Sequence, residues 1–217
     1  MYEGMSFDEL NALNEKRRKP LALPYEQYFG EMDISRTQKE RRINTAEALE
    51  DVFTDMFSLM FYLYASGGYD YSVASAQAID RYKSIATSLP ALSASMYLID
   101  THIPETVASV ADVVLKDPDN PFNFSIDRAR LIAENEANSV WNDAEFEEAV
   151  RTGKKYKTWH SILDKRTRDT HVVANGSTKP IMEPFEVGDY LMMFPRDETL
   201  GAGPEEIANC RCSVSYK

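Results

Sequence analysis

The chain has 217 residues, of which 43% are hydrophobic and 27% charged, and its formal net charge is -11. This length and composition suffice for one substantial core or two modest ones and do not resemble a disordered sequence. The acidic balance excludes bulk DNA binding, because counterion release needs a surplus of Lys and Arg.

The sequence does not predict a secreted protein, a membrane-spanning protein or a disulfide-stabilised one. The N-terminal residues lack a positively charged segment followed by an apolar stretch, so no secretory signal is predicted. The most apolar window, residues 56–65, is far shorter than the roughly 20 residues of a membrane-spanning helix. Cys210 and Cys212 lie too close together to bridge without strain, which argues against a disulfide framework and indicates synthesis in a reducing cytoplasm.

Residues 1–34 are polar, rich in Pro and Tyr, and poorly periodic. They predict an extended arm with one short helix near 7–16, since Pro20 and Pro24 interrupt helices. Such an arm either stays disordered or becomes ordered against a partner subunit.

Residues 35–120 predict a helical domain. Apolar residues recur every three or four positions from the N-cap Ser35 to position 65, where Ser66-Gly67-Gly68 ends the helix. Further helices are predicted over 72–88, ended by Pro90, and over 91–116, with a break at Pro104. The Met and aromatic stripes of these helices are typical of a core rather than of a cofactor pocket.

A boundary is predicted at residues 117–121, which are rich in Asp and Pro, and residues 121–217 form the third predicted domain. Its leading helix runs from Ser125 to about 152, ending at Gly153. Short strands follow, with candidates at Val172–Val173, Phe185–Val187, Tyr190–Phe194 and Cys212–Tyr216. The predicted fold class is therefore α+β, with a mainly helical N-terminal region followed by a small α+β C-terminal domain.

The last sixty residues contain the side chains most able to carry chemistry. If 158–170 is helical, Asp164 and Arg168 are four residues apart and pair on one face, and with Arg166 they would hold the helix to a loop. His171 would then lie at the C-terminal end, where a positive ring is favoured. The complete motif consists of Trp159, Asp164, Arg166, Arg168, His171, Gly176, Asn209, Cys210, Arg211 and Cys212.

Three interpretations of His171, Cys210 and Cys212 remain open. Zinc accepts such ligands, but a closed site needs a fourth, and His160, Asp164 and Asp169 lack a convincing spacing. A Cys nucleophile or a His base would imply catalysis, although no oxyanion motif accompanies them. The favoured interpretation is structural, because buried cysteines commonly act as small apolar side chains.

Residues 128–217 resemble the C-terminal region of the Mu F-like family of phage head-morphogenesis proteins. Residues 128–136 are similar to the family's Arg-x-x-x-Ile-Ala-Arg-Thr-Glu helix, with Glu134 and Asn135 replacing Arg-Thr. Residues 157–171 contain Lys-x-Trp followed by Asp-x-Arg-x-Arg-x-x-His. The remaining matches, in order, are Gly176, Glu183-Pro184-Phe185, Phe194-Pro195-Arg196-Asp197 and Ile207-Ala208-Asn209-Cys210-Arg211-Cys212.

The resemblance implies a minor head protein, found in the virion, that meets portal or capsid proteins during head assembly, DNA packaging or ejection. It implies a structural protein without catalytic residues. Local basic runs at 16–19 and 151–168 are the candidates for contact with phage DNA. The alternatives are a metal-stabilised binding module and a His/Cys-dependent nuclease or toxin-like enzyme.

Some relatives in that family carry cysteines at the positions of Arg168 and His171 and a histidine at the position of Ile207, which together with Cys-x-Cys would complete a zinc site. Too few ligands remain here for a closed site. The resemblance therefore implies a terminus without a cofactor, in which ion pairs around Arg168 replace the metal.

Overall fold

The computed structural model of the protein describes residues 2, 4–17, 19, 21–88 and 95–217. Contacts divide the chain into two compact units: unit 1 is 1–23, 45–88 and 96–133, and unit 2 is 24–44, 89–95 and 134–217. The predicted division at 34/35 and 120/121 stays a prediction.

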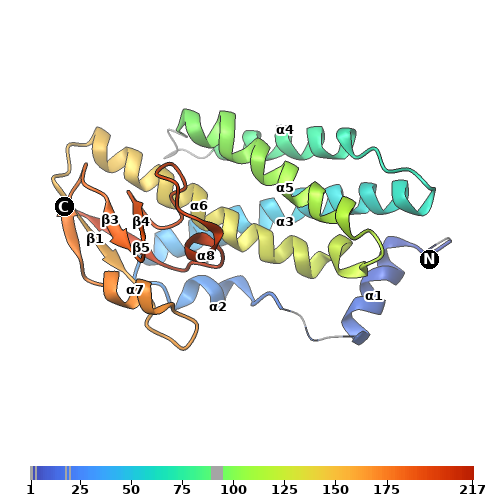
Figure 1. The fold of residues 1–217 in the computed structure, drawn as a ribbon, viewed down its shortest axis with the longest axis horizontal. Helices are drawn as coiled ribbons and strands as arrows, with labels where there is room; N and C mark the ends of the chain where they lie inside the picture. The colour runs from blue at the N-terminus through green and yellow to red at the C-terminus, as the bar shows by residue number, and fades with distance from the viewer. Residues whose placement is uncertain (1, 3, 18, 20, 89–94) are drawn as a thin grey trace. The chain divides into compact units, whose positions relative to one another are not determined.

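Figure 1 shows the fold as a ribbon, with labels on the α-helices and on most of the strands. The helices are α1 (Phe7–Arg17), α2 (Tyr25–Gly30), α3 (Arg36–Ala65), α4 (Ser72–Ser88), the π-helix η1 (Leu98–His102), α5 (Ile103–Lys116), the 3-10 helix η2 (Pro121–Phe124), α6 (Ile126–Arg151), α7 (Asp169–Ala174) and α8 (Pro204–Ile207). The strands are β1 (Tyr156–His160), β2 (Thr178–Pro180), β3 (Phe185–Val187), β4 (Tyr190–Met192) and β5 (Ser213–Tyr216). The predicted α+β class is confirmed.

The long helices begin where their caps predict. The Ser35 hydroxyl accepts from the Gln38 N–H at 3.3 Å, and the Gln38 side chain accepts from the Ser35 N–H at 3.0 Å, which is a reciprocal capping box for α3. The Ser125 hydroxyl likewise accepts from the Arg128 N–H at 3.1 Å at the start of α6. Helix α4 has the predicted bounds. None of the helices in the described ranges is both long and apolar enough to cross a membrane.

The first 34 residues contain more helix than predicted. Helix α1 was expected, but α2 follows Pro24, whose φ of -54° suits a position just before a first turn. Phe7 and Leu10 of α1 are buried in unit 1, and Tyr28 and Phe29 of α2 are buried in unit 2. An extended arm is therefore the wrong description of these helical stretches; Pro20 lies outside the described residues.

Pro104 does not break its helix. The π-helix η1 runs directly into α5, with the Ile103 N–H donating to the Leu98 carbonyl, and Pro104 lies in the first turn of α5. Pro90 and positions 91–94, at which the third helix was predicted to start, lie outside the described residues.

Unit 1 has an aromatic core. The rings of Phe61 and Phe124 meet edge to face at 5.6 Å, and Tyr64 stacks on Phe124 at 5.8 Å. The guanidinium of Arg128 lies 4.9 Å from the centroid of the Phe57 ring, so even this buried cation contacts an aromatic surface. The interpretation of the Met and aromatic stripes as core is confirmed for α3, where Met56 and Met60 are buried, but it is wrong for Met96, which is 80% exposed.

The sheets lie in unit 2. Strand β1 is central and pairs antiparallel with β2 and with β5, placing Trp159 opposite Val214, while β3 and β4 form a hairpin. Two predictions were wrong here. Residues 156–160 form a strand and not the start of a helix, since Lys157 and Trp159 alternate into the core. Val172 and Val173 lie in helix α7 and not in a strand.

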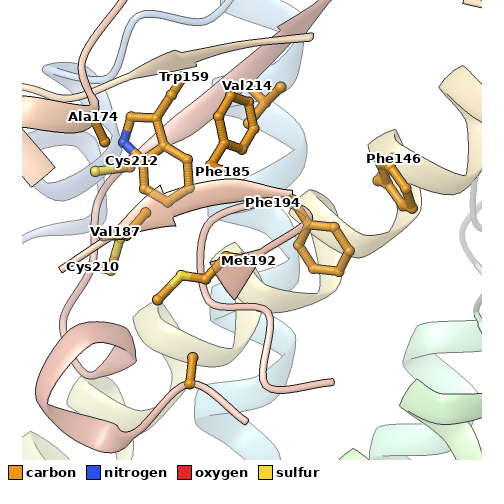
Figure 2. Close-up of a cluster of buried hydrophobic side chains, with 11 residues drawn as sticks. Phe146, Trp159, Ala174, Phe185, Val187, Met192, Phe194, Cys210, Cys212 and Val214 are labelled. Atoms are coloured by element: carbon orange, nitrogen blue, oxygen red, sulfur yellow. The ribbon is translucent and has the colours of Figure 1, made fainter. Parts of the chain in front are cut away.

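Figure 2 shows the apolar core of unit 2, in which aromatic rings and both cysteine side chains gather. The Trp159 ring meets the Phe185 ring edge to face at 5.3 Å. The cluster consists of Phe146, Trp159, Ala174, Phe185, Val187, Met192, Phe194, Ala202, Cys210, Cys212 and Val214.

Candidate functional site

Asp164 lies in the loop between β1 and α7 and pairs with Arg211. Its Oδ2 is 2.5 Å from Arg211 Nη2 and 3.6 Å from Arg166 Nε, while Arg211 Nη1 reaches Glu31 at 3.1 Å. The predicted Asp164–Arg168 pair is wrong, because this segment is not helical. Partial burial would raise the pKa of Asp164, but hydrogen bonds from Arg211, Arg166 and Thr167 outweigh it and hold that pKa below its usual range.

Arg168 precedes α7 and acts on main-chain groups. Its guanidinium donates to the carbonyl of Ala208 and, at 3.5 Å, to that of Glu206. In the described part of the chain, the ion-pair network expected around Arg168 instead centres on Arg211. Arg168 nevertheless ties α7 to the segment after α8.

Two motif residues have local structural roles. Asn209 adopts a positive φ of 55°, which Asn tolerates better than most side chains, and its N–H donates to Asn135 Oδ1 at 2.8 Å. Gly176, with a φ of 77°, ends the turn after α7, and its N–H donates to the Trp159 carbonyl at 2.8 Å. These contacts explain why the motif places Asn and Gly at these positions.

His171, Cys210 and Cys212 converge in the interior of unit 2. His171 Nδ1 lies 3.3 Å from Cys212 Sγ and 3.5 Å from Cys210 Sγ, and the side-chain ligand atoms of the three lie within 4.8 Å of one another. Each residue is at most 3% exposed. Among the described residues, these three side chains have ligand atoms close enough together to hold one metal ion.

Glu206 completes the cluster and was missed by the sequence analysis. His171 Nε2 lies 2.9 Å from Glu206 Oε2, and the Thr170 hydroxyl donates to the same oxygen at 2.9 Å. The helix α8 that carries Glu206 has four residues, so no periodicity marked its buried side. Glu206 shares no short sequence motif with His171.

The cluster shifts the ionisation of its members. A hydrogen bond from Cys212 outweighs burial and, with His171 nearby, holds the pKa of the Cys210 thiol well below its usual range. The same hydrogen bond, together with burial, raises the pKa of Cys212. Burial would lower the pKa of His171, but contact with Cys210 and the charge of Glu206 raise it. The Cys210 sulfur is thus favoured as a thiolate.

A second polar network lies between α3 and α6 in unit 2. Arg42 is fully buried, and its guanidinium donates to Asn138 Oδ1 at 3.2 Å, to Asn142 Oδ1 at 3.2 Å and to Glu145 at 2.9 Å. Asn138 in turn donates to the Cys210 carbonyl at 3.0 Å. The sequence does not reveal this network, because a buried polar residue on a helix has the same local pattern as a solvated one.

His160 hydrogen-bonds in the order of a hydrolytic triad. Its Nε2 lies 2.8 Å from the Ser215 hydroxyl and its Nδ1 lies 3.0 Å from Asp33 Oδ2. The Asp33 side chain is 78% exposed, however, whereas the carboxylate of such a triad acts from a buried position. The geometry therefore fits a surface hydrogen-bond chain better than a catalytic centre.

One member of the predicted basic run is not at the surface. Lys157 is fully buried, its Nζ donates to the Met193 carbonyl at 2.8 Å, and it lies about 5 Å from the centroids of the Phe146 and Phe185 rings. Arg151 pairs with Glu148, while Lys154, Lys155 and Lys165 are exposed. The inclusion of Lys157 in a DNA-contacting patch was wrong.

Comparison with known proteins identifies the chain at the family level. The family described as phage Mu protein F like protein matches residues 101–215, which is more than half of the chain and includes every motif residue. No curated protein and no solved structure matches the chain. The match begins earlier than the predicted resemblance and includes α5. The chain belongs to the phage Mu protein F like family of phage head-morphogenesis proteins.

Proposed function

We propose that the protein is a minor head protein of a tailed phage that acts at the portal or procapsid in head assembly, DNA packaging or ejection. The observation that carries the proposal is the family match over residues 101–215. The protein would reside in the virion, in the head interior or at the portal vertex, after assembly in the host cytoplasm.

The proposed role is structural and not catalytic. The motif residues Asp164, Arg168, Asn209 and Arg211 form hydrogen bonds and ion pairs to the protein itself. Such internal contacts explain their presence without a substrate. His171 is 2% exposed, so a substrate could reach its ring only after local opening.

The proposed partners are portal or capsid subunits, which need an accessible surface. Val173 on α7 is 83% exposed and Met182 is 64% exposed, and both lie within the matched residues. Exposed apolar side chains contribute to protein interfaces when a partner covers them. Val73 on α4 is 58% exposed and lies outside the residues that the family matches, so it serves as the control.

The test is co-expression of the full chain with the portal and major capsid proteins of the same phage, followed by sedimentation of the particles. We expect the chain to co-sediment with procapsids in a fixed ratio to the portal. V173E should reduce incorporation several-fold and V73E should not. A chain absent from particles that contain the portal, or equal loss with both variants, would contradict the proposal.

A further inference from the structure

The cluster of His171, Cys210 and Cys212 has the spacing of a metal site. Tetrahedral zinc, with Zn–S near 2.3 Å and Zn–N near 2.05 Å, requires its nitrogen and sulfur ligands to be about 3.5 Å apart. The distances from His171 Nδ1 are 3.3 Å to Cys212 Sγ and 3.5 Å to Cys210 Sγ. The ligand atoms therefore stand close to their metal-bound separation without rearrangement of the backbone.

The histidine ring is oriented as in a metal ligand. Its Nε2 is 2.9 Å from Glu206 Oε2, and Glu206 is itself fixed by the Thr170 hydroxyl at 2.9 Å. A proton on Nε2, directed at Glu206, leaves the lone pair of Nδ1 facing the two sulfurs. A carboxylate on the far nitrogen is the usual support of a metal-bound histidine, since it fixes both ring and tautomer.

The backbone presents both sulfurs to the same side. Both sulfurs lie within 3.5 Å of His171 Nδ1, and the intervening Arg211 points away, to Asp164 and Glu31. The carbonyl of Cys210 is held by Asn138 Nδ2 at 3.0 Å. Two independent contacts thus fix the orientation of the Cys210–Cys212 segment.

We propose that His171, Cys210 and Cys212 bind one zinc ion, with Glu206 as the positioning residue of His171. Two thiolates balance the 2+ charge of the ion, so a neutral metal–thiolate unit is buried, and the protons displaced from the ligands pass to solvent. A non-protein ligand such as water occupies the fourth position, as in other three-ligand zinc sites. The ion joins α7 to the segment that leads into β5. This proposal is independent of the proposed role in the phage head.

Metal analysis of the full chain, purified without chelator and without a metal-affinity column, tests the site directly. We expect one zinc ion per chain. After removal of zinc, titration with Co²⁺ should produce the sulfur-to-cobalt charge-transfer absorption that reports thiolate ligands. C210S and C212S should each weaken that absorption and lower zinc affinity by more than the loss of a positioning residue would.

Two variants separate ligation from general damage. E206Q should lower zinc affinity on the order of 10–100-fold while the charge-transfer absorption at saturation is kept, because the ligands themselves remain. H160Q is the matched control, since His160 lies in the same unit but hydrogen-bonds Ser215 and Asp33 instead. It should bind as the wild type does.

Zinc binding by the folded wild-type chain and the effect of zinc on its thermal midpoint test the site even if a cysteine variant folds poorly. Zinc should raise the thermal midpoint of the wild type and of H160Q, and should have less effect on C212S. Substoichiometric zinc in a folded wild-type chain, with no charge-transfer absorption at excess Co²⁺, would overturn the site. Equal losses of affinity in H160Q and E206Q would overturn the assignment of Glu206.

Discussion

The two compact units are stabilised by different kinds of interior. Unit 1 buries mainly apolar and aromatic side chains, and its buried basic residues among those described are Arg128 and His102. Unit 2 buries a smaller apolar cluster together with many charged side chains, including Arg42, Lys157, Arg196 and Arg211. Apolar packing tolerates exchange of similar volumes, whereas a buried charge requires its own partners. Unit 2 should therefore tolerate fewer substitutions of its buried side chains than unit 1, and each should cost it more free energy of unfolding.

The largest effect is expected at Arg42. R42M keeps much of the side-chain volume but leaves Asn138, Asn142 and Glu145 without their donor, which should lower the free energy of unfolding by about 3–5 kcal/mol. The fluorescence of Trp141 and Trp159, both in unit 2, would follow this transition in urea.

M60L is the matched change in unit 1, because Met60 lies on the same helix α3 and is fully buried. Its cost should stay below about 1.5 kcal/mol, since Leu and Met have similar volumes. If R42M and M60L cost the same, the contrast between the units is wrong.

The next effect concerns Lys157, whose pKa is lowered by burial to about 8 from 10.5. The unfolded chain therefore binds more protons between these pH values, and this lysine makes the protein more stable as the pH rises through that range. K157M removes the effect. The wild type should gain about 3 kcal/mol of unfolding free energy relative to K157M as the pH rises from 7 to above 10.

Denaturant unfolding of both proteins at several pH values measures the Lys157 difference directly. Comparison with K157M at each pH cancels the titration of tyrosines and cysteines elsewhere in the chain. A difference that does not change with pH would mean that the buried lysine keeps the ordinary proton affinity of an exposed one.

A smaller effect is expected at Asp164. D164N should cost about 1–2 kcal/mol at pH 7, because Arg211 is nearly buried and loses a charged partner. The folded pKa of Asp164 lies below its unfolded value, so its contribution is complete above about pH 4 and is lost as the pH falls further. The difference between D164N and wild type should shrink in acid.

The corresponding pair in unit 1 is Glu50 with Arg130, whose Arg130 side chain is 43% exposed. E50Q should cost only about 0–1 kcal/mol, because solvent screens a partly exposed pair. Thermal or urea unfolding of D164N and E50Q at pH 7 and pH 3 compares the two pairs. A larger cost for E50Q would reverse the expected order.

The smallest effect concerns DNA, which we propose contacts the exposed lysines of unit 2. K154E/K155E should reduce the salt dependence of DNA retention by about two counterions and leave stability unchanged. The control K83E/K116E reverses the same number of charges in unit 1. Equal retention by wild type and K154E/K155E would reject the contact.

The sequence by itself determined the long helices and the family. The 3.6-residue periodicity of α3, α4 and α6 and the caps at Ser35 and Ser125 depend on neighbours within one or two turns, so they can be predicted locally. The order of motif residues from Trp159 to Cys212 placed the chain in its family without requiring knowledge of their contacts.

Only the tertiary structure decided which of those residues act together. Strand β1 was missed because its alternation spans five residues, too few to outweigh a helix-like spacing of charges. Glu206 joins His171 across 35 positions, and Arg211 joins Glu31 across 180. Such pairs depend on the path of the backbone, because a charged side chain carries no local signal of whether water or a distant partner will surround it.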